Sequence, residues 1–533
     1  MNGAKTKITV KKKYLVMPVG HHVSQRRVSV FSDGELRDSF DIRLDYANPY
    51  DCAFYDVSEY AGSEIEISVS DGVEFSDLQS DTEKHDGSSI RNYRPAVHFT
   101  PEFGWINDPN GLLFYESPVT GKKTWHMFYQ FNPYDDIWGN MHWGHAVSED
   151  LIHWSKKDPA LFPDGLGTMF SGSAITDERN VSGLRDGGEH PILLFYTAAG
   201  GSSLLSSGKQ FTQCMAYSTD GGETFQKYGG NPIIGHIRAD NRDPKVIWCD
   251  ELSRYVLALY LDGNTFSLFA SDNLIDWEHL QDMVIANDAE CPDIFPLPVN
   301  GNPKNRKWVI SAASGRYQVC EVRNGLFDVI QDSRPLEYSS HAYAAQTFSG
   351  VPDGRRIGFS WDRDIFYPAA GFNGQMSVPY ELSLRFDGTE YTMCREPAGE
   401  LASIRKNEKE YASVTVTPEK PFSLRLDKMA YDVVIDVSRF SSPFDIVLLG
   451  KTVSIDTEHN IVTVGNTRFP LTVSGERHTL RMIIDTCTAE FFLGGGEACS
   501  TIPFLGDYNL NRITVMTTGR TELTKIKISE LVP

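Results

Sequence analysis

Three acidic residues stand beside turn-forming residues at the ends of strand-like runs. They are Asp108 in WINDPNG, Asp243 in ADNRDPKVIW and Glu290 in NDAECPDIF. Asn, Pro and Gly are common in tight turns. Turn formation alone does not explain why Trp105 shares so short a bend with an acid. We therefore interpret WINDPNG as a loop that directs Asp108 into a pocket.

Three carboxylates in one pocket suit cleavage of a glycosidic bond. That reaction needs one carboxylate as nucleophile and one protonated carboxyl as general acid, and a third acid can hold a substrate hydroxyl and stabilise a cationic transition state. The general acid needs desolvation or a neighbouring carboxylate to raise its pKa, whereas hydrogen-bond donors such as Asn107 and Asn110 keep a nucleophile ionised. Taken singly, each acid also has a structural explanation, as a turn cap, a partner of Arg242 or a surface residue.

The elements that must position these acids read as β-strands. From about residue 96 to 395, short strands alternate with Gly, Asp and Asn turns, and long amphipathic helices are absent. A loose repeat recurs in AVSEDLIHW at 146–154, AYSTDGGETF at 216–225 and ASDNLIDW at 270–277. One hairpin turn per unit favours propeller blades over an ordinary series of hairpins. Strand ends in a propeller gather around a central channel, so acids far apart in sequence can converge.

The flanking regions predict two further β domains. Residues 1–90 alternate polar and apolar types in short runs, followed by a polar, turn-rich linker from Ser80 to Pro95. Residues 400–533 return to alternating strands such as YDVVIDVS and TLRMIID, which predicts a β-sandwich. The chain is therefore predicted to be all-β, with a small N-terminal domain at 1–90, a propeller at 91–395 and a sandwich at 400–533.

Composition narrows the classes of partner. The 533 residues carry a formal net charge of -21, which opposes binding to nucleic acid or an anionic membrane surface. The aromatic content of 12% suits both β-structure and stacking on sugar rings. Eight scattered cysteines form no CxxC pair, so zinc and redox sites of that kind have no support, and we expect mostly reduced, buried thiols.

The motifs resemble those of glycoside hydrolase family 32, the β-fructosidases. Eight blocks between about His98 and Leu384 follow in the family's order: HFTPEFGWINDPNG, FYQFNPYDDIWGNMHWGHAVSEDLIHW, GTMFSGSAI, MAYSTDGGETFQKYGGNPII, RDPKV, AECPDIF, YAAQTF and MSVPYELSL. The resemblance implies a five-bladed propeller followed by a β-sandwich, and retention of configuration through a covalent fructosyl-enzyme. The N-terminal domain resembles the extra β domain of fructan-degrading enzymes from Bacteroides-like gut bacteria.

Carried over by position, Asp108 resembles the family's nucleophile, Glu290 the general acid/base and Asp243 the transition-state stabiliser. Retaining enzymes place the nucleophile and the acid about 5–5.5 Å apart. Seven further residues are expected to bind the substrate: Asn107, Gln130, Ser171 and Arg242 through hydrogen bonds to sugar hydroxyls, Trp138 and Phe170 as an apolar wall, and Trp361 at the rim, where a propeller-core position is the alternative.

Other reactive residues in these motifs are expected to be structural. His142 and His145 have ligand-like spacing but point to opposite faces of a strand, so no metal site is predicted there or elsewhere. Cys291 is expected to pack beneath Glu290 and help to desolvate it, and Asp288 and Asp293 to serve as turn or strand-end residues. His341 and Ala342 stand where many relatives have an acidic or aromatic residue, a departure that concerns the sugar rim.

The sequence thus predicts an exo-acting fructan β-fructosidase that releases fructose from levan or inulin, with sucrose as a further substrate. No cofactor, nucleic-acid partner or membrane span is expected, and the oligomeric state is left open. An endo-levanase and a fructosyltransferase are the enzymatic alternatives, and a non-catalytic fructan-binding protein is the alternative of another class. A periplasmic or cell-surface location is expected if a signal peptide has been removed, and a cytoplasmic one otherwise.

Overall fold

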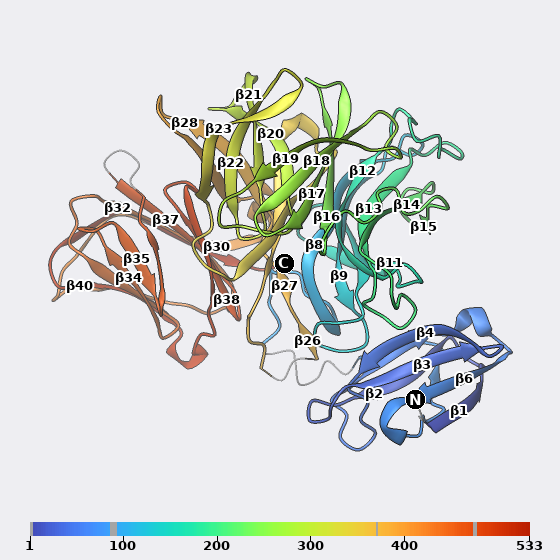
Figure 1. Ribbon diagram of the computed structural model, residues 1–533. Coiled ribbons are helices and arrows are strands. Elements are labelled where there is room, and N and C mark those ends of the chain that lie inside the picture. The colour runs from blue at the N-terminus through green and yellow to red at the C-terminus, as the bar shows by residue number, and fades with distance from the viewer. Residues whose placement is uncertain (1–3, 86–92, 369–370, 473–476) are drawn as a thin grey trace.

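The computed structural model describes residues 4–85, 93–368, 371–472 and 477–533, which form almost only β-structure. Figure 1 shows a central propeller with the small N-terminal unit (blue) on one side and a sandwich (orange to red) on the other. The all-β prediction of propeller, C-terminal sandwich and N-terminal β domain is therefore confirmed. The helices of the described residues are short 3-10 turns: η1 Ser58–Tyr60, η2 Ser70–Gly72, η3 Pro352–Gly354, η4 Gly399–Ile404 and η5 Tyr508–Leu510.

The propeller is built from five antiparallel four-stranded blades. In chain order, their strands are β8 Gly104–Glu116, β9 Lys123–Asn132, β10 His142–Ser148 and β11 Trp154–Leu161; β12 Thr168–Thr176, β13 Ile192–Ala199, β14 Thr212–Ser218 and β15 Gln226–Lys227; β16 Arg242–Cys249, β17 Arg254–Asp262, β18 Thr265–Ser271 and β19 Glu278–Val284; β20 Asp293–Val299, β21 Asn302–Ser311, β22 Arg316–Arg323 and β23 Leu326–Pro335; and β24 Ala342–Thr347, β25 Arg356–Asp362, β28 Tyr380–Phe386 and β29 Tyr391–Pro397. Two short strands, β26 Phe372–Asn373 and β27 Gln375–Met376, pair with β8 and β25.

The sequence repeat marks the same turn in three blades. It joins β10 to β11, β14 to β15 and β18 to β19, the third and fourth strands of each blade. In each turn an Asp or Asn side chain accepts two backbone N–H groups ahead of it, as Asp150 does from Ile152 and His153 at 3.0 and 2.8 Å. Asp220 and Asn273 repeat this arrangement. The recurring pattern of a Ser followed two residues later by Asp or Asn is thus a side-chain-capped turn, and it marks the same position in three of the blades.

The N-terminal unit contains two antiparallel sheets around its own core. One sheet has the strand order β1-β6-β3-β4 and the other β5-β2-β7. Their bounds are β1 Ala4–Thr9, β2 Tyr14–Val19, β3 Arg26–Ser32, β4 Glu35–Ile42, β5 Asp51–Asp56, β6 Glu64–Val69 and β7 Gln79–Ser80. Phe103 and Tyr134 from the propeller side of the chain join this core, so apolar packing ties the unit to the propeller.

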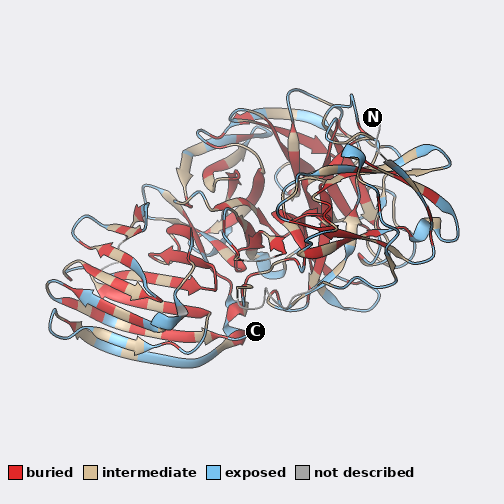
Figure 2. Ribbon diagram, turned by 90° about the horizontal axis from the view of Figure 1, so that it is seen from below, coloured by how far each residue is buried: buried red, intermediate tan, exposed pale blue. Residues whose placement is uncertain are grey.

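The C-terminal sandwich consists of two six-stranded sheets, ordered β30-β41-β32-β37-β38-β39 and β31-β40-β33-β34-β35-β36. The strands are β30 Arg405–Val416, β31 Phe422–Arg425, β32 Tyr431–Ser438, β33 Phe444–Leu448, β34 Lys451–Asp456, β35 Ile461–Val464, β36 Thr467–Pro470, β37 Arg477–Ile484, β38 Thr488–Leu493, β39 Ala498–Pro503, β40 Arg512–Thr517 and β41 Thr521–Leu531. Buried residues lie between the two sheets (Figure 2). Phe492 of β38 and Cys499 of β39 belong to a second buried cluster that they share with residues of the propeller.

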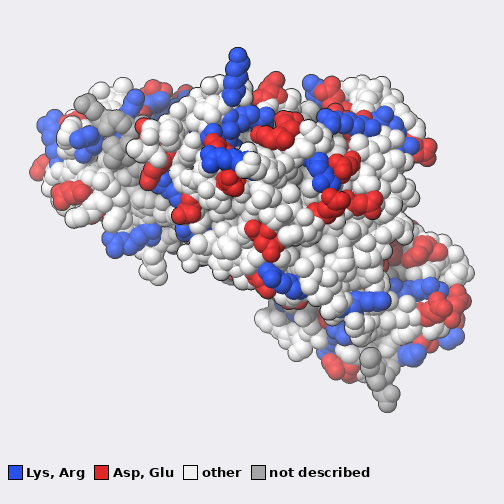
Figure 3. All heavy atoms as spheres, turned by 45° about the horizontal axis from the view of Figure 1, so that its top comes forward, with Lys and Arg blue, Asp and Glu red and all other residues white. Residues whose placement is uncertain are grey.

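The strands of the three units span Ala4–Ser80, Gly104–Pro397 and Arg405–Leu531, while the division at 1–90, 91–395 and 400–533 stays a prediction. Part of the predicted linker, residues 86–92, lies outside the described residues. All eight cysteines are free thiols, and six of them are buried. Figure 3 shows acidic and basic side chains interspersed on the face in view, and none of the described helices has the length and apolarity to cross a bilayer.

Candidate active site

One cavity of about 610 Å³ gathers every sequence-predicted site residue. It is lined by the three acids and by all seven residues expected to bind substrate. Five more residues complete the lining: Phe211, Asp240, Cys291, Tyr343 and Arg363. The innermost strands β8, β12 and β16, together with the segments at the starts of β20 and β24, supply most of the polar side chains. Convergence at the channel, inferred from the propeller pattern, is therefore confirmed.

Asp108 lies within strand β8, so the prediction of a WINDPNG loop is wrong. The whole motif belongs to Gly104–Glu116, and two bulges interrupt its pairing with β9, between Ile106 and Pro109 and between Asn110 and Leu113. A bulge turns side chains away from the regular alternation of a strand. The turn-forming residues of the motif therefore sit at bulges that redirect the Asp108 side chain within a strand, and they do not close a hairpin.

Two donors fix the Asp108 carboxylate. Ser171 Oγ donates to Oδ2 at 2.6 Å, and Asn107 Nδ2 donates to Oδ1 at 3.0 Å. Asn107 is itself held by Trp105, whose Nε1 donates to Asn107 Oδ1 at 2.8 Å. This contact explains why the motif places a tryptophan beside the acid. Asn110, also expected to reach Asp108, instead lies against Gln130 and Ser171. With the amide orientation that satisfies both of its ends, its oxygen accepts from Gln130 Nε2 at 2.9 Å and its nitrogen donates to Ser171 Oγ at 3.3 Å.

Asp243 is the most buried of the three acids. Its backbone N–H donates to Thr197 Oγ1 at 3.0 Å, and its Oδ2 accepts the Cys291 N–H at 2.9 Å. Burial is the main cause that raises the pKa of Asp243, to about 7; the Arg242 charge opposes the rise, and the Asp108 charge adds to it. A carboxyl of this kind holds a proton near neutral pH.

Glu290 lies in a different electrostatic environment. Its Oε1 accepts from Arg242 Nη2 at 2.5 Å, and its Oε2 accepts from Tyr343 Oη at 2.5 Å. Burial alone would raise the pKa of Glu290, but the hydrogen bonds from Tyr343 and Arg242 and the Arg242 charge outweigh it, so the pKa lies below its ordinary value. The expectation of a raised pKa for this acid is therefore wrong for the free protein, because the sequence does not show which donors fold against it.

The backbone at these acids is left-handed. Asp243, Glu290 and Cys291 have φ values of 67°, 60° and 39°, and none of them is a glycine. Such conformations cost on the order of 1–3 kcal/mol each and persist only where the surrounding structure enforces them. The strain coincides with a bulge between Arg242 and Lys245 in β16. The carboxylates of Asp243 and Glu290 are thus oriented by a backbone conformation that regular strands do not adopt.

Aromatic rings form two walls of the cavity. On one side Trp138, which is 55% exposed, meets Phe170 edge-to-face at a centroid distance of 6.0 Å, and Phe170 meets Phe211 at 5.5 Å. On the other side Trp361 packs edge-on against Tyr343 at 6.5 Å, and the Arg363 guanidinium lies 4.1 Å from the Tyr343 ring centroid. Apolar walls with a few polar groups at the base are typical of small-molecule sites.

Tyr343 and Arg363 line the cavity but had no role predicted from the sequence, although Tyr343 donates directly to Glu290. Tyr343 lies in the YAAQTF block and Arg363 follows Trp361 in GFSWDRD, so both stood within recognised segments. Cys291 does not pack beneath Glu290 as expected; its Sγ lies 3.6 Å from Asp108 Oδ2 and 3.5 Å from Asp243 Oδ2. His341, flagged as a departure, holds the rim through its Nδ1, 3.1 Å from the Arg363 carbonyl oxygen.

The remaining discounted residues behave as structural groups. Asp288 accepts the N–H groups of Ala289, Ser314 and Arg316, and Asp293 at the start of β20 accepts the Thr347 N–H at 2.7 Å. His145 is buried against His126, with Nε2 and Nδ1 3.1 Å apart. Burial lowers the pKa of His126 to about 4, so this histidine stays neutral at ordinary pH.

Sequence comparison places this architecture in a family. The model for the Glycosyl hydrolases family 32 N-terminal domain matches residues 98–397, and the model for the family 32 C-terminal region matches residues 400–530. The chain belongs to glycosyl hydrolase family 32. The matched ranges take in the whole cavity and the sandwich, and they leave the N-terminal unit outside the family's two regions.

Known family 32 proteins resemble the chain in sequence and fold. A levanase of Bacillus subtilis is 36% identical over 352 residues, 61% of this chain and 50% of that protein. An extracellular exo-inulinase of Aspergillus niger is 32% identical over 58% of this chain and 66% of its own length. The matched part thus spans only half to two thirds of these relatives. The solved exo-inulinase of Aspergillus awamori superposes with a TM-score of 0.72 at 25% identity, covering 83% of this chain and 98% of that one.

A second solved structure adds a ligand-bound relative. The fructofuranosidase of Schwanniomyces occidentalis, complexed with fructose, superposes with a TM-score of 0.73 at 25% identity, over 83% of this chain and 99% of that chain. Family 32 membership and these solved structures account for the propeller and the sandwich, and the three carboxylates converge within the region that matches the family's N-terminal domain.

Proposed function

We propose that the chain is a retaining, exo-acting fructan β-fructosidase, which removes terminal β-D-fructofuranosyl units from levan or inulin and also cleaves sucrose. The observation that carries the proposal is the convergence of Asp108, Asp243 and Glu290 on one aromatic-walled cavity. The relatives named levanase and exo-inulinase support the substrate class. A cavity of about 610 Å³ falls in the range typical of sites that enclose small ligands.

In the first step Asp108 attacks the anomeric carbon of the terminal fructosyl unit. A bond forms between its carboxylate oxygen and that carbon as the glycosidic C–O bond breaks. The electron pair stays on the leaving oxygen, which takes the proton of Glu290. Ser171 and Asn107 orient the Asp108 carboxylate for attack through their hydrogen bonds to its two oxygens. The product is a covalent fructosyl-enzyme.

In the second step Glu290, now ionised, takes a proton from water. The water oxygen bonds to the anomeric carbon and the Asp108 ester bond breaks, which restores the carboxylate and regenerates protonated Glu290. The two displacements together retain the configuration. Asp243, held by the Cys291 amide on Oδ2, can accept hydrogen bonds from fructose hydroxyls and stabilise the cationic character of both transition states.

The side chain of Glu290 is 32% exposed in this structure. A sugar that fills the cavity removes that solvent and raises the pKa of Glu290, since desolvation disfavours the charged form. Substrate binding thereby moves Glu290 toward the protonated form that the first step requires. The polar groups around it, Arg242 and Tyr343, are then available to the hydroxyls of the sugar, and a sugar that lacks a matching hydroxyl leaves a buried donor unpaired.

We further propose that the protein acts outside the cytoplasm, because the inulinase relative is described as extracellular. Among the enzymatic alternatives, an endo-levanase requires a groove open at both ends and a fructosyltransferase requires an acceptor site that excludes water. A non-catalytic binder requires no nucleophile, and retention of all three acids in one cavity argues against it.

A product time course on levan, inulin and sucrose tests the proposal. We expect free fructose from the first time point, with no early oligosaccharides, and the relative rates identify the preferred linkage. Early oligosaccharides would overturn exo action while leaving the three acids their roles. Glucose released from sucrose without a matching amount of free fructose would overturn the hydrolase proposal in favour of transfer, and absence of any product from all three substrates would overturn it in favour of binding alone.

A further inference from the structure

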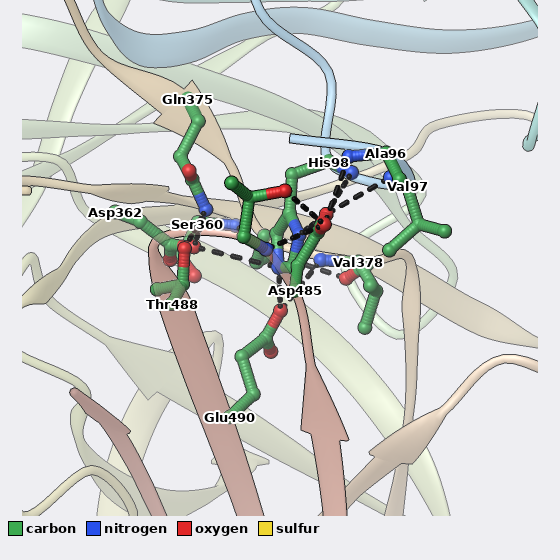
Figure 4. Close-up of polar contacts among 12 residues, drawn as sticks. Ala96, Val97, His98, Ser360, Asp362, Gln375, Val378, Asp485, Thr488 and Glu490 are labelled. Carbon is green, nitrogen blue, oxygen red and sulfur yellow. Dashed lines mark hydrogen bonds and ion pairs between the residues drawn. The ribbon is translucent and has the colours of Figure 1, made fainter. Parts of the chain in front are cut away.

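A fully buried polar group lies between the propeller and the sandwich, apart from the active-site cavity. It consists of His98, which precedes β8, Asp362 at the end of β25, and Asp485 and Glu490 of the sandwich. His98 is 4% exposed and the three acids at most 1%. Figure 4 shows their side chains directed toward one another from both units.

The imidazole is held between carboxylates on both of its nitrogens. His98 Nδ1 lies 2.8 Å from Asp485 Oδ2, and Nε2 lies 2.8 Å from Glu490 Oε1 and 3.9 Å from Asp362 Oδ2. Asp485 is well satisfied, since its two oxygens also accept the backbone N–H groups of Ala96 and Val97. Asp485 therefore acts as an anchor that fixes the orientation of the imidazole.

The other two carboxylates are incompletely satisfied. Asp362 Oδ1 and Glu490 Oε2 are buried and have no hydrogen-bond partner. Three carboxylates face a single imidazole, and the nearby Arg395 is already paired with Glu337. Even with His98 protonated, ionised acids leave the group with excess negative charge, and burial of unpaired charge is costly.

We propose that His98, Asp362 and Glu490 bind a divalent cation, with Zn²⁺ as the best match. The ligands are His98 Nε2 and one oxygen from each of the two acids, and these three atoms lie within 4.8 Å of one another. Zinc binds imidazole nitrogen and carboxylate oxygen at about 2.0–2.2 Å, which sets neighbouring donor atoms roughly 3.0–3.5 Å apart. The observed 2.8 and 3.9 Å bracket that range, so small side-chain shifts suffice.

The position of Asp485 supports this assignment. Histidines that bind metals donate their other ring N–H to a carboxylate or carbonyl, which fixes the tautomer and makes the ligating nitrogen more basic. The Nδ1 contact to Asp485 has this form. An imidazole ligand favours zinc over calcium or magnesium, which prefer all-oxygen sites. A second cavity of about 280 Å³, lined in part by Ala96, Val97 and His98, borders the group and offers a route of entry.

The proposed cation clamps the propeller to the sandwich. It joins the segment before β8 and the end of β25 to strand β38, and so locks the contact between the two matched family regions. The inference departs from the sequence-based expectation of no metal site, which rested on the spacing of His142 and His145 and on the absence of a CxxC pair. It does not depend on the proposed β-fructosidase activity, because none of its ligands lines the active-site cavity.

Metal analysis of the full chain tests the proposal. The protein is unfolded in guanidinium chloride with a chelator, and refolded with or without Zn²⁺. We expect about one zinc per chain after gel filtration and a higher melting temperature for the zinc-refolded sample. Absence of stoichiometric zinc together with an unchanged melting temperature would overturn the proposal, and would assign the group to a hydrogen-bonded imidazolium with a protonated Asp362.

Two variants separate the alternatives. Asp362→Asn removes a ligand yet closely mimics a protonated aspartate, so we expect zinc affinity to fall at least tenfold. His153→Gln removes an exposed histidine and serves as the control for adventitious surface binding; we expect unchanged zinc content. Equal loss of zinc in both variants, or full retention in Asp362→Asn, would contradict the site. If Asp362→Asn fails to fold, the wild-type refolding comparison still decides.

Discussion

Arg242 lies between two of the three cavity carboxylates, with Nη2 2.5 Å from Glu290 Oε1 and Nε 3.8 Å from Asp243 Oδ2. Asp243 holds a proton up to a pKa of about 7, while the pKa of Glu290 lies below its ordinary 4.5. The singly protonated cluster therefore exists mainly with the proton on Asp243. The form that can start the reaction carries this proton on Glu290. It is a minor tautomer with the same total charge as the major form, so both forms disappear at the same macroscopic pKa.

This coupling predicts the pH dependence of kcat/KM, which reports the free enzyme. We expect kcat/KM to fall as pH rises through about 7, the pKa of Asp243, because the cluster then loses its last proton. In Asp243→Asn the only proton left belongs to Glu290, whose pKa is lowered by Tyr343 and Arg242, so the alkaline limb of the residual activity should move to lower pH. Rate profiles of both proteins on sucrose provide the measurement. An alkaline limb that stays in place in the variant would contradict the shared proton.

A second prediction at this scale concerns Glu290 as the proton donor. Glu290→Gln should lower kcat on levan or sucrose by roughly 10²–10⁴-fold, the usual contribution of general acid catalysis. The loss in kcat/KM, which reports formation of the fructosyl-enzyme, should be smaller for a fructoside with an acidic phenol as leaving group, since that oxygen departs without a proton. Glu278→Gln, which changes an exposed carboxylate on β19, is the matched control and should retain full activity. Equal losses on both substrates would contradict the donor role.

Sequence reasoning found the acids but not their partners. The motif blocks identified Asp108, Asp243 and Glu290 as well as the seven residues expected to bind substrate. This was possible because a motif records the types and spacing of residues that are close together in the sequence. The Tyr343 contact to Glu290 joins residues 53 positions apart, and the Thr197 contact to Asp243 joins residues 46 positions apart. Such contacts depend on how blades meet at the axis, and this is why the pKa of Glu290 was predicted with the wrong sign.

At the scale of elements, bulges in the innermost strands of the blades direct the side chains of the site into the cavity. Bulges interrupt β8 beside Asp108, β12 between Phe170 and Gly172, and β16 beside Asp243. The repeated turns revealed the blades because each is set by a local side-chain cap. The bulges were not predictable in the same way, since packing against neighbouring strands determines them, and WINDPNG therefore looked like a loop.

Gly111 tests the importance of the β8 bulge. It has φ of 51°, and a Cβ there would lie 2.7 Å from the Phe128 ring and 3.1 Å from Trp143. Gly111→Ala should cost about 2–5 kcal/mol of stability, from left-handed strain and overpacking together, and should lower kcat by shifting Asp108. Chemical denaturation and activity assays measure both effects.

Gly121 provides the matched control for that variant. Its φ is 70°, but a Cβ there meets nothing within 4 Å. Gly121→Ala should therefore cost only the backbone strain, about 1–2 kcal/mol, and leave kcat unchanged. Similar stability losses and similar kcat values for the two variants would contradict the view that packing at the bulge positions the nucleophile.

At the scale of the whole molecule, the N-terminal unit grips the segment that carries Trp138. Arg43 N donates to Asp135 Oδ2 at 2.9 Å, and the Arg43 guanidinium binds Asp135 and Asp136. Asn140 exchanges two hydrogen bonds with the Asp41 backbone at 2.9 and 2.7 Å. These contacts flank Trp138 at the cavity wall, and we infer from them that the unit braces this segment.

Arg43→Ala tests this bracing. It removes the cationic partner of the fully buried Asp135 carboxylate, and loss of one partner of a buried ion pair costs about 3–5 kcal/mol. We expect the Trp138 segment to loosen and KM for fructan to rise severalfold, with a smaller change in kcat. Lys7→Ala, which removes an exposed pair with Glu64 in the same unit, should leave both constants unchanged. Unaltered KM in Arg43→Ala would show that the unit does not shape the site.

In the proposed mechanism Asp108 forms a covalent bond to fructose, and trapping the fructosyl-enzyme tests this step most directly. Glu290→Gln should react with an activated fructoside yet hydrolyse the intermediate slowly, because no base activates water. Rapid acid quenching, digestion and mass spectrometry then locate the adduct. We predict one fructosyl unit on the peptide that contains Asp108, and none on that peptide in an Asp108→Asn, Glu290→Gln double variant. An adduct on another residue, or product of inverted configuration without any adduct, would contradict the account.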